Sequence, residues 1–480
     1  MRIKVIFLTF VFLFAIGFVN AQQKYQPTWE SIDSRPVSEW FGNAKFGIFI
    51  HWGPYSVPAW SPKGTYSEWN GNFKGDEVAK YHEKTYGKDF SYFEFGKMFT
   101  ADLFEPDQWA KLFKDAGAKY VVLTSKHHDG FTLWPNKEAN DRGFAWNSME
   151  VGAKKDLVGL LSKSVKDAGL KMGLYYSLYE WYHPWWINDK ERFVDEHFLP
   201  QIKDLVTNYN PDVLWADGEW DITDKDWKSK EFLTWLFNES VAKDNIVIND
   251  RWGKGIRKKH GGYFTTEYES EAPEFTKPWE ECRGMGFSFG YNQNEDAEDY
   301  NSVKALTLML VNIVSTGGNL LLDIGPDARG KIPPIMQDRL LKMGKWLKVN
   351  GEAIYNTRTW KNSFQWSEGE QNFKPKQHYL GGDFIIKQTV DPEPGFAIKE
   401  LFFTQNDKAY FAISPKWVEK EIIIKDFKPS STVKVSLLAT GEIVNWKQSG
   451  KDMIILMPPY TPNKMNEEDK YAYTFKITKE

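Results

Sequence analysis

The chain contains eight short apolar runs separated by polar and amphipathic segments. Runs of this length, bounded by turn-forming residues, predict buried β-strands. The predicted strands are Phe46–Ile50, Tyr120–Leu123, Met172–Tyr176, Val213–Trp215, Ile246–Ile248, Tyr263–Thr265, Phe287–Phe289 and Leu320–Ile324.

Amphipathic segments lie between most of these runs and after the last one. They are Pro106–Ala116, Lys155–Ala168, Glu196–Tyr209, Ser229–Ala242, Ala297–Ser315 and Pro333–Val349. Strands that alternate with helices indicate parallel β/α units, and eight such units predict a closed (β/α)8 TIM-like barrel. Because the helices before the sixth and seventh strands are weak or absent, we expect an irregular barrel. An open doubly wound sheet remains the alternative on periodicity alone.

The pattern changes from about Tyr355, where helical periodicity stops and short alternating runs begin. These runs predict a C-terminal antiparallel β-sandwich. Its predicted strands are Phe384–Lys387, Ala397–Phe403, Tyr410–Ser414, Glu421–Ile424, Val433–Leu438, Met453–Met457 and Tyr471–Ile477. We therefore expect a barrel domain over residues 22–357 and a sandwich domain over residues 358–480.

The first 21 residues have the pattern of a secretory signal peptide. Arg2 and Lys4 precede the apolar stretch Val5–Val19, and Val19-Asn20-Ala21 offers small residues for cleavage. The apolar stretch is short for a membrane span, so an uncleaved anchor is the alternative. The single cysteine, Cys282, cannot form an internal disulfide and lies too far from the cleavage point to carry a lipid. We expect export to the periplasm or the extracellular space, without membrane insertion after cleavage.

Composition narrows the class of partner. Removing Arg2 and Lys4 leaves 59 Lys+Arg against 65 Asp+Glu, so the formal charge changes from −4 to −6. A mildly acidic chain without a basic block argues against nucleic acid or anionic membrane as a partner. The chain also holds 22 Trp, 22 Tyr and 34 Phe, and indole faces pack well against sugar rings. The sequence leaves the oligomeric state open, including a homo-oligomer.

Polar side chains follow the predicted strands at the points where they end. The first strand leads into His51, the second into Lys126-His127-His128, and the third into Tyr175. Asp217 follows the fourth strand, Asn249-Asp250-Arg251 the fifth and Glu267 the sixth. In a parallel barrel these strand ends share one rim, where active sites stand. The sequence therefore predicts a polar pocket with aromatic walls, which suits a sugar.

Each of these residues also has a purely structural interpretation. His127 and His128 could bind a metal, but no HxH or HExxH spacing is present, and we favour hydrogen bonds to a substrate. His51 could be a satisfied structural histidine. Arg251 could simply pair with Asp250. We expect no metal and no cofactor.

Carboxylates at neighbouring strand ends suggest glycoside hydrolysis by a nucleophile and an acid/base. Asp217 suits the nucleophile, because its short side chain at the end of a central strand is held rigidly. The acid must stay protonated near neutral pH, which requires burial or a nearby negative charge. Glu267, directly after its strand, and Glu280, on an expected loop or short helix, are the principal candidates.

Six motifs together carry a resemblance to a known family. They are WFGNAKFGIFIHWGPYSVPAW, YVVLTSKHHDGF, LWADGEW, INDRWG, GFSFGYN and GGNLLLDIGPDARG. In this order they closely resemble the α-L-fucosidases of glycoside hydrolase family 29, from about Trp40 to Tyr355. The resemblance implies a retaining, metal-independent exo-hydrolase that removes terminal α-L-fucose from oligosaccharides or glycoconjugates through a covalent glycosyl-enzyme.

The resemblance also assigns roles to individual residues. Asp217 matches the family nucleophile, and Trp215 matches an aromatic residue beside it. Phe289 matches the aromatic residue that packs on the methyl-bearing side of fucose. The positions that match fucose contacts are His51, Glu68, Trp69, His127, His128, Tyr175 and Arg251. The TEY segment favours Glu267 as the acid/base, with Glu280 as its rival, and KHHDGF and SFGYN resemble members with relaxed linkage preference.

Three other functions remain open at this point. A secreted glycan-binding protein could keep the barrel and lack catalysis. A metal-dependent hydrolase could be built on His51, His127 and His128. A glycosidase of the same fold could act on another sugar.

Overall fold

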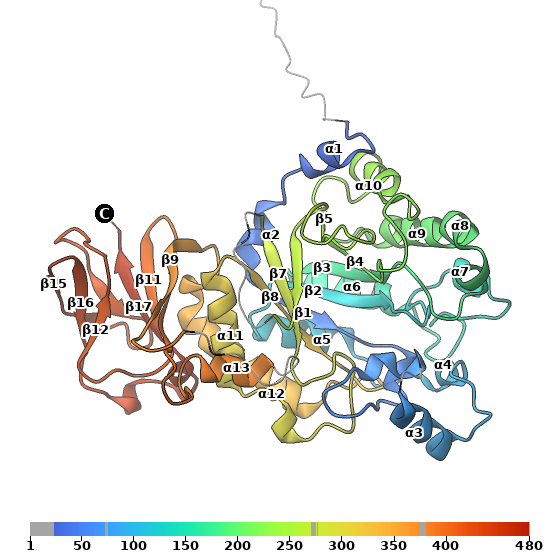
Figure 1. The fold of residues 1–480 in the computed structure, drawn as a ribbon. Helices are drawn as coiled ribbons and strands as arrows, with labels where there is room; N and C mark the ends of the chain where they lie inside the picture. The colour runs from blue at the N-terminus through green and yellow to red at the C-terminus, as the bar shows by residue number, and fades with distance from the viewer. Residues whose placement is uncertain are drawn as a thin grey trace, which may run out of the picture.

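The chain folds into a parallel barrel followed by an antiparallel sandwich (Figure 1). The computed structural model describes residues 24–72, 75–269, 275, 277–371, 373 and 381–479. The predicted signal peptide lies outside these residues. Within them, no helix combines the length and the apolar character that crossing a membrane requires.

Eight strands form one parallel sheet in the order β5-β4-β3-β2-β1-β8-β7-β6. Their bounds are β1 Phe46–Ile50, β2 Tyr120–Lys126, β3 Lys171–Ser177, β4 Val213–Asp217, β5 Val247–Ile248, β6 Phe264–Glu267, β7 Trp279–Gly284 and β8 Asn319–Ile324. In the described part of the chain, β5 and β6 share no ladder. Backbone hydrogen bonds from Tyr263 to Ile248 (3.0 Å) and from Gly262 to Asn249 (3.2 Å) join them instead. The predicted fold class is confirmed, irregularity included.

Strand β1 shows why these runs become barrel strands. Phe46, Ile48 and Ile50 pack outward against the helices, whereas Phe49 belongs to a separate cluster inside the barrel. Side chains alternate along a strand, so a continuous apolar run serves both faces at once. Gly47 faces the ring of Tyr120, which occupies the space that a β-carbon would take.

Helices surround the sheet (Figure 1). The long barrel helices are α5 Pro106–Asp115, α6 Leu157–Asp167, α9 Leu199–Tyr209, α10 Ser229–Asn238, α11 Val303–Ser315 and α12 Pro334–Asn350. The others are α1 Trp29–Asp33, α2 Glu39–Ala44, α3 Asp76–Tyr86, α4 Glu94–Met98, α7 Pro184–Asn188 and α8 Lys190–Arg192, the last leading into a π-helical segment, Phe193–Phe198. The predicted helices therefore form, with ends that differ by a few residues.

The predicted seventh strand was wrong. β7 is Trp279–Gly284, and Phe287–Phe289 lies in the loop that follows it. The sequence of β7, WEECRG, carries three charged residues, so it does not show the apolar run expected of a buried strand. Glu281 pairs with Arg283 of the same strand, and side chains of other strands bind Glu280 and Glu281 inside the fold, which the sequence of the segment does not reveal.

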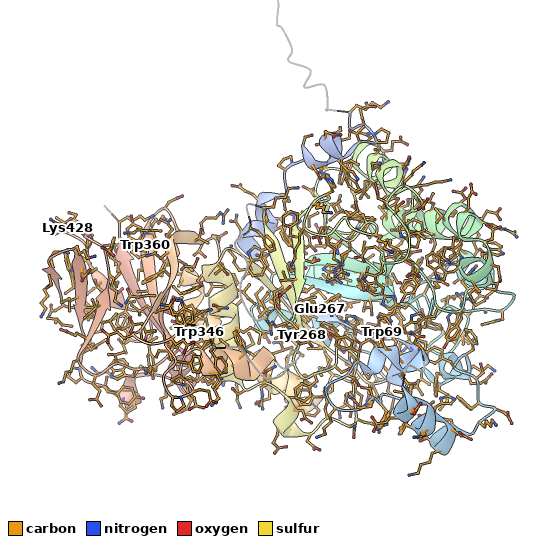
Figure 2. All side chains as sticks on the ribbon, viewed as in Figure 1. Trp69, Glu267, Tyr268, Trp346, Trp360 and Lys428 are labelled. Carbon is orange, nitrogen blue, oxygen red and sulfur yellow. The ribbon has the colours of Figure 1, made fainter. Side chains whose placement is uncertain are left out.

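Two antiparallel sheets form the C-terminal sandwich, in the orders β14-β13-β17-β11-β10-β9 and β12-β16-β15. Their strands are β9 Arg358–Trp366, β10 Lys399–Gln405, β11 Ala409–Ser414, β12 Glu421–Ile424, β13 Val435–Leu437, β14 Ile443–Val444, β15 Trp446–Ser449, β16 Asp452–Leu456 and β17 Tyr473–Thr478. Leu401 and Phe403 belong to the core between the sheets, whereas Phe402 joins the large core of the barrel. Trp346 of α12 also donates to the carbonyl of Ala472 (Figure 2).

One predicted strand of the sandwich is a helix. Phe384–Lys387 lies within α13, Gly381–Lys387, which packs beside α11. Phe384 and Ile385 are both buried. A short apolar run fits either a strand or a buried helix, and here packing against α11 decided the outcome.

Candidate active site

A cavity of about 280 Å³ opens at the carboxyl ends of the barrel strands. Residues on or directly after β1, β2, β3, β4, β6 and β7 contribute to its wall. The lining residues are Phe49, His51, Tyr66, Glu68, Trp69, His127, His128, Tyr175, Trp215, Asp217, Trp220, Arg251, Glu267, Cys282 and Phe289. Every residue to which the sequence gave a catalytic or substrate-binding role lines this cavity, except Glu280. Three other residues that follow predicted strands do not line it: Lys126, Asn249 and Asp250.

Asp217 is the last residue of β4 and is buried. Its Oδ1 accepts a hydrogen bond from Nη1 of Arg251 at 2.7 Å, and its Oδ2 accepts one from the hydroxyl of Tyr175 at 2.9 Å. Burial opposes ionisation, but the charges of Arg251, His128 and Arg257 outweigh it and lower the pKa of Asp217 to about 2. Asp217 is therefore an ionised, rigidly held carboxylate at neutral pH.

Arg251 joins the two predicted catalytic carboxylates. It donates through Nη1 to Asp217, and through Nη2 to Oε2 of Glu267 at 3.3 Å. Its Nε binds the hydroxyl of Thr265 at 3.0 Å, and its guanidinium lies 4.4 Å from the ring centre of Trp215. Asp250 is not its partner, because that carboxylate accepts from Thr265 instead.

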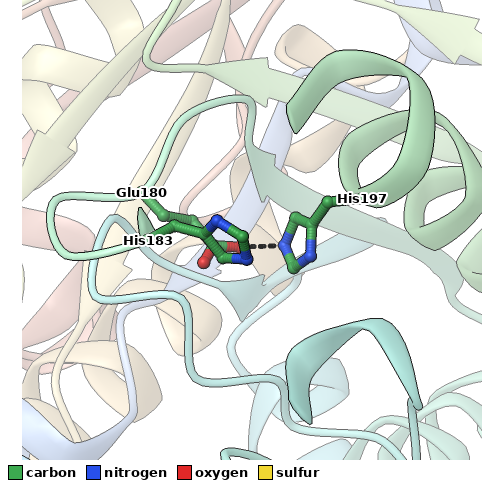
Figure 3. Close-up of side chains that lie close together, drawn as sticks. All are labelled: Glu180, His183 and His197. Atoms are coloured by element: carbon green, nitrogen blue, oxygen red, sulfur yellow. Dashed lines mark hydrogen bonds and ion pairs between the residues drawn. The ribbon is translucent and has the colours of Figure 1, made fainter. Parts of the chain in front are cut away.

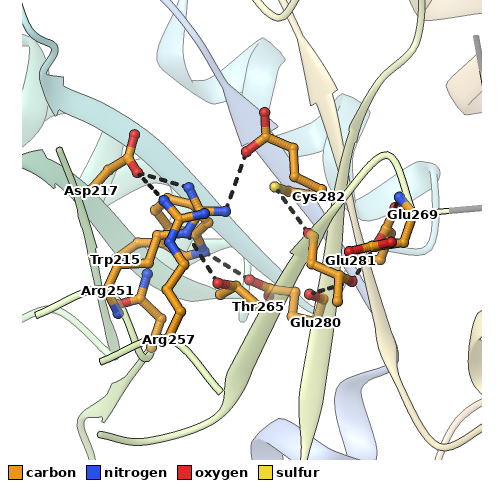
Figure 4. A network of polar contacts seen from close by, with 12 residues as sticks. Trp215, Asp217, Arg251, Arg257, Thr265, Glu269, Glu280, Glu281 and Cys282 are labelled. Carbon is orange, nitrogen blue, oxygen red and sulfur yellow. Dashed lines mark hydrogen bonds and ion pairs between the residues drawn. The ribbon is translucent and has the colours of Figure 1, made fainter. Parts of the chain in front are cut away.

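A second arginine supports the same carboxylate (Figure 4). Nη2 of Arg257 lies 3.5 Å from Oδ1 of Asp217, and the same side chain binds the buried carboxylate of Glu219. Sequence reasoning missed both residues. Glu219 stands within the LWADGEW motif, but Arg257 reaches the site only because the loop after β5 folds back over β4.

Glu267 ends β6 and is more exposed than Asp217, with 29% of its side chain accessible against 11%. Its Oε1 accepts a hydrogen bond from the hydroxyl of Tyr66 at 3.0 Å. Because Asp217 and Glu267 bind two nitrogens of one guanidinium, they face each other across the pocket. The more accessible carboxyl group is the one that solvent protons reach.

The structure contradicts the placement of Glu280 on a loop. Glu280 lies in β7, fully buried, and accepts hydrogen bonds from Tyr120 (2.5 Å) and from the indole of Trp215 (2.8 Å). Burial raises its pKa to about 7. Cys282, two residues on, pairs with Glu267 in register and lines the pocket. Residues i and i+2 share a face, so Glu280 lies one layer beneath the pocket floor.

The three histidines present imidazoles to the pocket in different ways. Nδ1 of His51 lies 2.6 Å from Asp323 of β8, and burial lowers the pKa of His51 to about 3. Nδ1 of His128 donates to Ser177 at 2.7 Å, and its Nε2 lies 3.7 Å from Asp217. Burial also lowers the pKa of His127, well below its usual value. The neutral imidazoles of His51 and His127 suit hydrogen bonds to hydroxyl groups.

Glu68 adds a third carboxyl group to the pocket. It accepts hydrogen bonds from the amide of Gly290 (2.9 Å) and the hydroxyl of Ser288 (3.2 Å). Burial raises its pKa to about 7, despite these donors. The side chain can therefore either donate to or accept from a ligand near neutral pH.

Aromatic side chains complete the wall. The ring of Phe289 stacks on His51 with centroids 4.9 Å apart and lies 5.4 Å from Tyr66. The ring centres of Trp69 and Trp220 lie 6.0 Å apart, and Trp220, at the mouth of the cavity, is 37% exposed. The sequence did not single out Phe49, Tyr66 or Trp220 for the site, because aromatic residues are abundant along the whole chain.

One group of side chains elsewhere in the barrel has the composition of a metal site. Ligand atoms of Glu180, His183 and His197 lie within 4.8 Å of one another (Figure 3). However, Glu180 already binds Nζ of Lys126 at 2.8 Å and also pairs with Arg142. Two positive charges at the same carboxylate disfavour a third cation. The chemistry of this cluster fits an ion-pair network rather than a metal site.

Known proteins match almost the whole chain. The family model for Alpha-L-fucosidase matches residues 12–352, and that for the Alpha-L-fucosidase C-terminal domain matches residues 396–478. The tissue alpha-L-fucosidase of Bos taurus is 39% identical over 468 residues, which are 95% of this chain and 91% of that protein. An alpha-L-fucosidase of Dictyostelium discoideum is 44% identical over 373 residues, 75% of this chain and 79% of that protein.

Solved structures agree with these matches. A crystal structure of Thermotoga maritima alpha-fucosidase in complex with a mechanism-based inhibitor superposes with a TM-score of 0.77 and 36% identity. The match covers 95% of this chain and 100% of that one. A structure of the same Thermotoga maritima protein with fucose gives a TM-score of 0.76.

Proposed function

This chain belongs to the alpha-L-fucosidase family and is a glycoside hydrolase, and from that premise we propose that it cleaves terminal α-linked L-fucose with retention of configuration. Family membership supports fucosidase activity over glycan binding without catalysis and over hydrolysis of another sugar. The stereochemistry, the residues that carry it and the location of the enzyme form the proposal.

The observation that carries the proposal is the pairing of Asp217 and Glu267 with one guanidinium. In retaining glycosidases the two carboxyl groups stand about 5–5.5 Å apart, whereas in inverting enzymes about 6.5–9.5 Å leaves room for a water molecule. Shared contact with Arg251 brings the two carboxyl groups into one pocket, which supports their action as a pair, and family membership favours the retaining spacing.

In the first step, an oxygen of Asp217 attacks C1 of fucose while Glu267 protonates the departing glycosidic oxygen. The bond from C1 to that oxygen breaks, and fucose stays bound to Asp217 as an ester. In the second step, Glu267 takes a proton from water, whose oxygen attacks C1 and releases fucose and the free carboxylate. Arg251 and Tyr175 keep Asp217 ionised and oriented for the attack of the first step.

The remaining wall of the pocket matches the two sides of a fucose ring. His51, His127, His128 and Glu68 offer hydrogen bonds to hydroxyl groups, while Phe289 offers an apolar surface to the methyl group. The cavity of about 280 Å³ suits a single sugar, which supports removal of fucose from chain ends. Fucosylated oligosaccharides or glycoconjugates are the proposed substrates, with relaxed linkage preference. The N-terminal signal pattern supports a periplasmic or extracellular location.

Product analysis tests the stereochemistry. Proton NMR of a fresh reaction should show α-L-fucose first, with the β-anomer appearing only by later mutarotation. Initial release of the β-anomer would overturn the retaining mechanism.

Variants of the acidic residues test the assignments. Asp217→Gly should lose about 10³-fold or more in turnover, and azide should restore part of it by attacking in place of the carboxylate. Glu267→Ala should lose about 10²–10⁴-fold on natural glycans and much less on aryl fucosides with good leaving groups. Glu280→Ala is the matched control. If its losses depended on the leaving group and those of Glu267→Ala did not, the acid/base assignment would be wrong.

A further inference from the structure

The N-terminal arm, residues 24–38, lies on the side of the barrel where β5 and β6 do not pair. Its helix α1 packs beside α10, close to β5 (Figure 1). The segment that joins β5 to β6, residues 249–262, contains no helix, so α1 takes the place beside the sheet that a barrel helix would occupy. We call residues 249–262 the arginine loop, because it carries Arg251 and Arg257.

The arm contacts the far end of the arginine loop directly. Asp33 accepts a hydrogen bond from the backbone amide of Gly261 (2.9 Å), and its other oxygen lies 2.8 Å from Nδ1 of His260. The indole of Trp29 stacks on His260, with ring centres 5.0 Å apart and planes 10° from parallel. Trp29 also donates to Asp224 at 3.0 Å, which ties the arm to the loop after β4.

The start of the arginine loop is anchored in the barrel, where Trp252 is fully buried and stacks on Phe232. The far half, which carries Arg257, is more exposed and is held by backbone hydrogen bonds, among them one from Lys254 to Ile222 (2.9 Å). Lys258 donates its backbone amide to Asp250 (2.8 Å), and Gly262 donates to Asn249 (3.2 Å). The side chains of Arg251 and Arg257 extend from this loop to the carboxylate of Asp217 (Figure 4). We propose that Trp29 and Asp33 are positioning residues for catalysis, which hold the far half of the arginine loop so that the guanidinium of Arg257 stays against Asp217.

The consequence concerns the charge of the carboxylate. The charged and titratable side chains that face Asp217 are Arg251, Arg257, His128, Tyr175 and Glu219, with His51 and Tyr179 also close enough to interact with its charge. A nearby cation lowers the pKa of a carboxyl group by about 1–3. If the arm lets the far half of the arginine loop move away, the pKa of Asp217 rises, and the carboxylate protonates at a pH where the native enzyme is active. This inference rests on the proposed function, in which Asp217 is the nucleophile.

The pH dependence of kcat/KM tests the inference, because its acid limb reports the free enzyme's essential carboxylate. Wild type, Asp33→Ala and Trp29→Ala would be assayed on an aryl fucoside by brief pH-jump measurements from about pH 1 to 7, so that the limb near pH 2 is covered. Both variants should shift the acid limb upward by about one pH unit. Asp33→Asn retains an acceptor for Gly261 and should stay within about 0.3 of wild type.

Asn238→Ala is the matched control. The side chain of Asn238 binds the backbone of Tyr25 at 2.9 and 2.8 Å, so this variant loosens the arm from α10 without touching the arginine loop. It should leave the acid limb where it is. Where Trp29→Ala does not fold, Trp29→Phe keeps the stacking on His260, loses the hydrogen bond to Asp224 and should give a smaller shift in the same direction.

Two results would overturn the inference. One is an unchanged acid limb in Asp33→Ala and Trp29→Ala, even if their melting temperatures fall, because the arm would then be purely structural. The other is an equal shift in Asn238→Ala. Failure of the proposed function looks different, since azide would then fail to rescue Asp217→Gly.

Discussion

Replacing Glu180 with glutamine should destabilise the barrel more than removing any one of its cationic partners. Glu180 lies at the centre of a buried network in which it binds Lys126 at 2.8 Å, His197 at 2.7 Å, and Arg142. The side chains of Lys126 and Glu180 are fully buried. The glutamine variant would leave two buried cations without a counter-charge.

The expected loss of stability follows from the number of buried charges that each substitution leaves without a partner. Removing one partner of a buried ion pair and stranding the other costs about 3–5 kcal/mol. Glu180→Gln should therefore lower the free energy of unfolding by about that amount. Lys126→Met should cost less, roughly 1–2 kcal/mol, because Arg142 and His197 still compensate the carboxylate that remains. The double variant should lose less stability than the sum of the two single losses. Each substitution removes a charge that the other substitution alone would leave without a partner.

Urea denaturation followed by tryptophan fluorescence measures these differences, and the midpoints of the three variants can be compared directly. Although burial opposes its ionisation, the charge of Lys126 holds the pKa of Glu180 well below its usual value. The contribution of the ionised carboxylate is therefore present above the unfolded-state pKa of about 4.3 and is lost only as the pH falls further. Equal losses in Glu180→Gln and Lys126→Met, or strict additivity in the double variant, would refute the reasoning.

Three further predictions concern the pocket and the barrel seam. Burial raises the pKa of Glu68 to about 7, so its contribution to stability is complete below about pH 4.5 and is lost as the pH rises through 7. As the pH rises between these values, the stability of Glu68→Gln should therefore increase by up to about 3 kcal/mol relative to wild type. Urea midpoints of the two proteins that change in parallel with pH would contradict this. Gly262→Ala should lower the melting temperature and activity together, because its β-carbon would overlap the carbonyl oxygen of Ile248, whereas Gly42→Ala, with open space around it, should do neither. Activity should persist after dialysis against excess EDTA, because we assign the pocket imidazoles to hydrogen bonding. A loss of activity that a divalent metal restores would show that the imidazoles bind a metal instead.

Much of the fold could be predicted because apolar runs and amphipathic segments reflect burial directly. Seven of the eight predicted barrel strands overlap those in the structure. β7 was missed because a strand with Glu280, Glu281 and Arg283 looks polar until its neighbours are known. Glu280 binds Tyr120 of β2 and Trp215 of β4, and Glu281 binds Thr266 of β6, contacts that exist only after the strands have assembled.

Much of the candidate site could also be predicted, because most of its polar residues stand at the ends of predicted strands. His51, Asp217 and Glu267 stand at or directly after strand ends, and parallel strands bring those ends to one rim. Tyr66 and Arg257 lie far from any predicted strand end, so nothing in their local sequence points to the pocket. Their positions depend on how two loops fold over the barrel.

The sequence by itself determined which residue types gather at the rim, because the spacing of strands and polar strand ends is written along the chain. It could not decide between Glu267 and Glu280, since each follows or lies within a short segment of mixed polarity. Only the register of β6 against β7 separates them, pairing Glu267 with Cys282 and leaving Glu280 opposite Thr265. Two residues along a strand make one layer of the barrel, and that single layer divides a carboxyl group in the pocket from one buried beneath its floor.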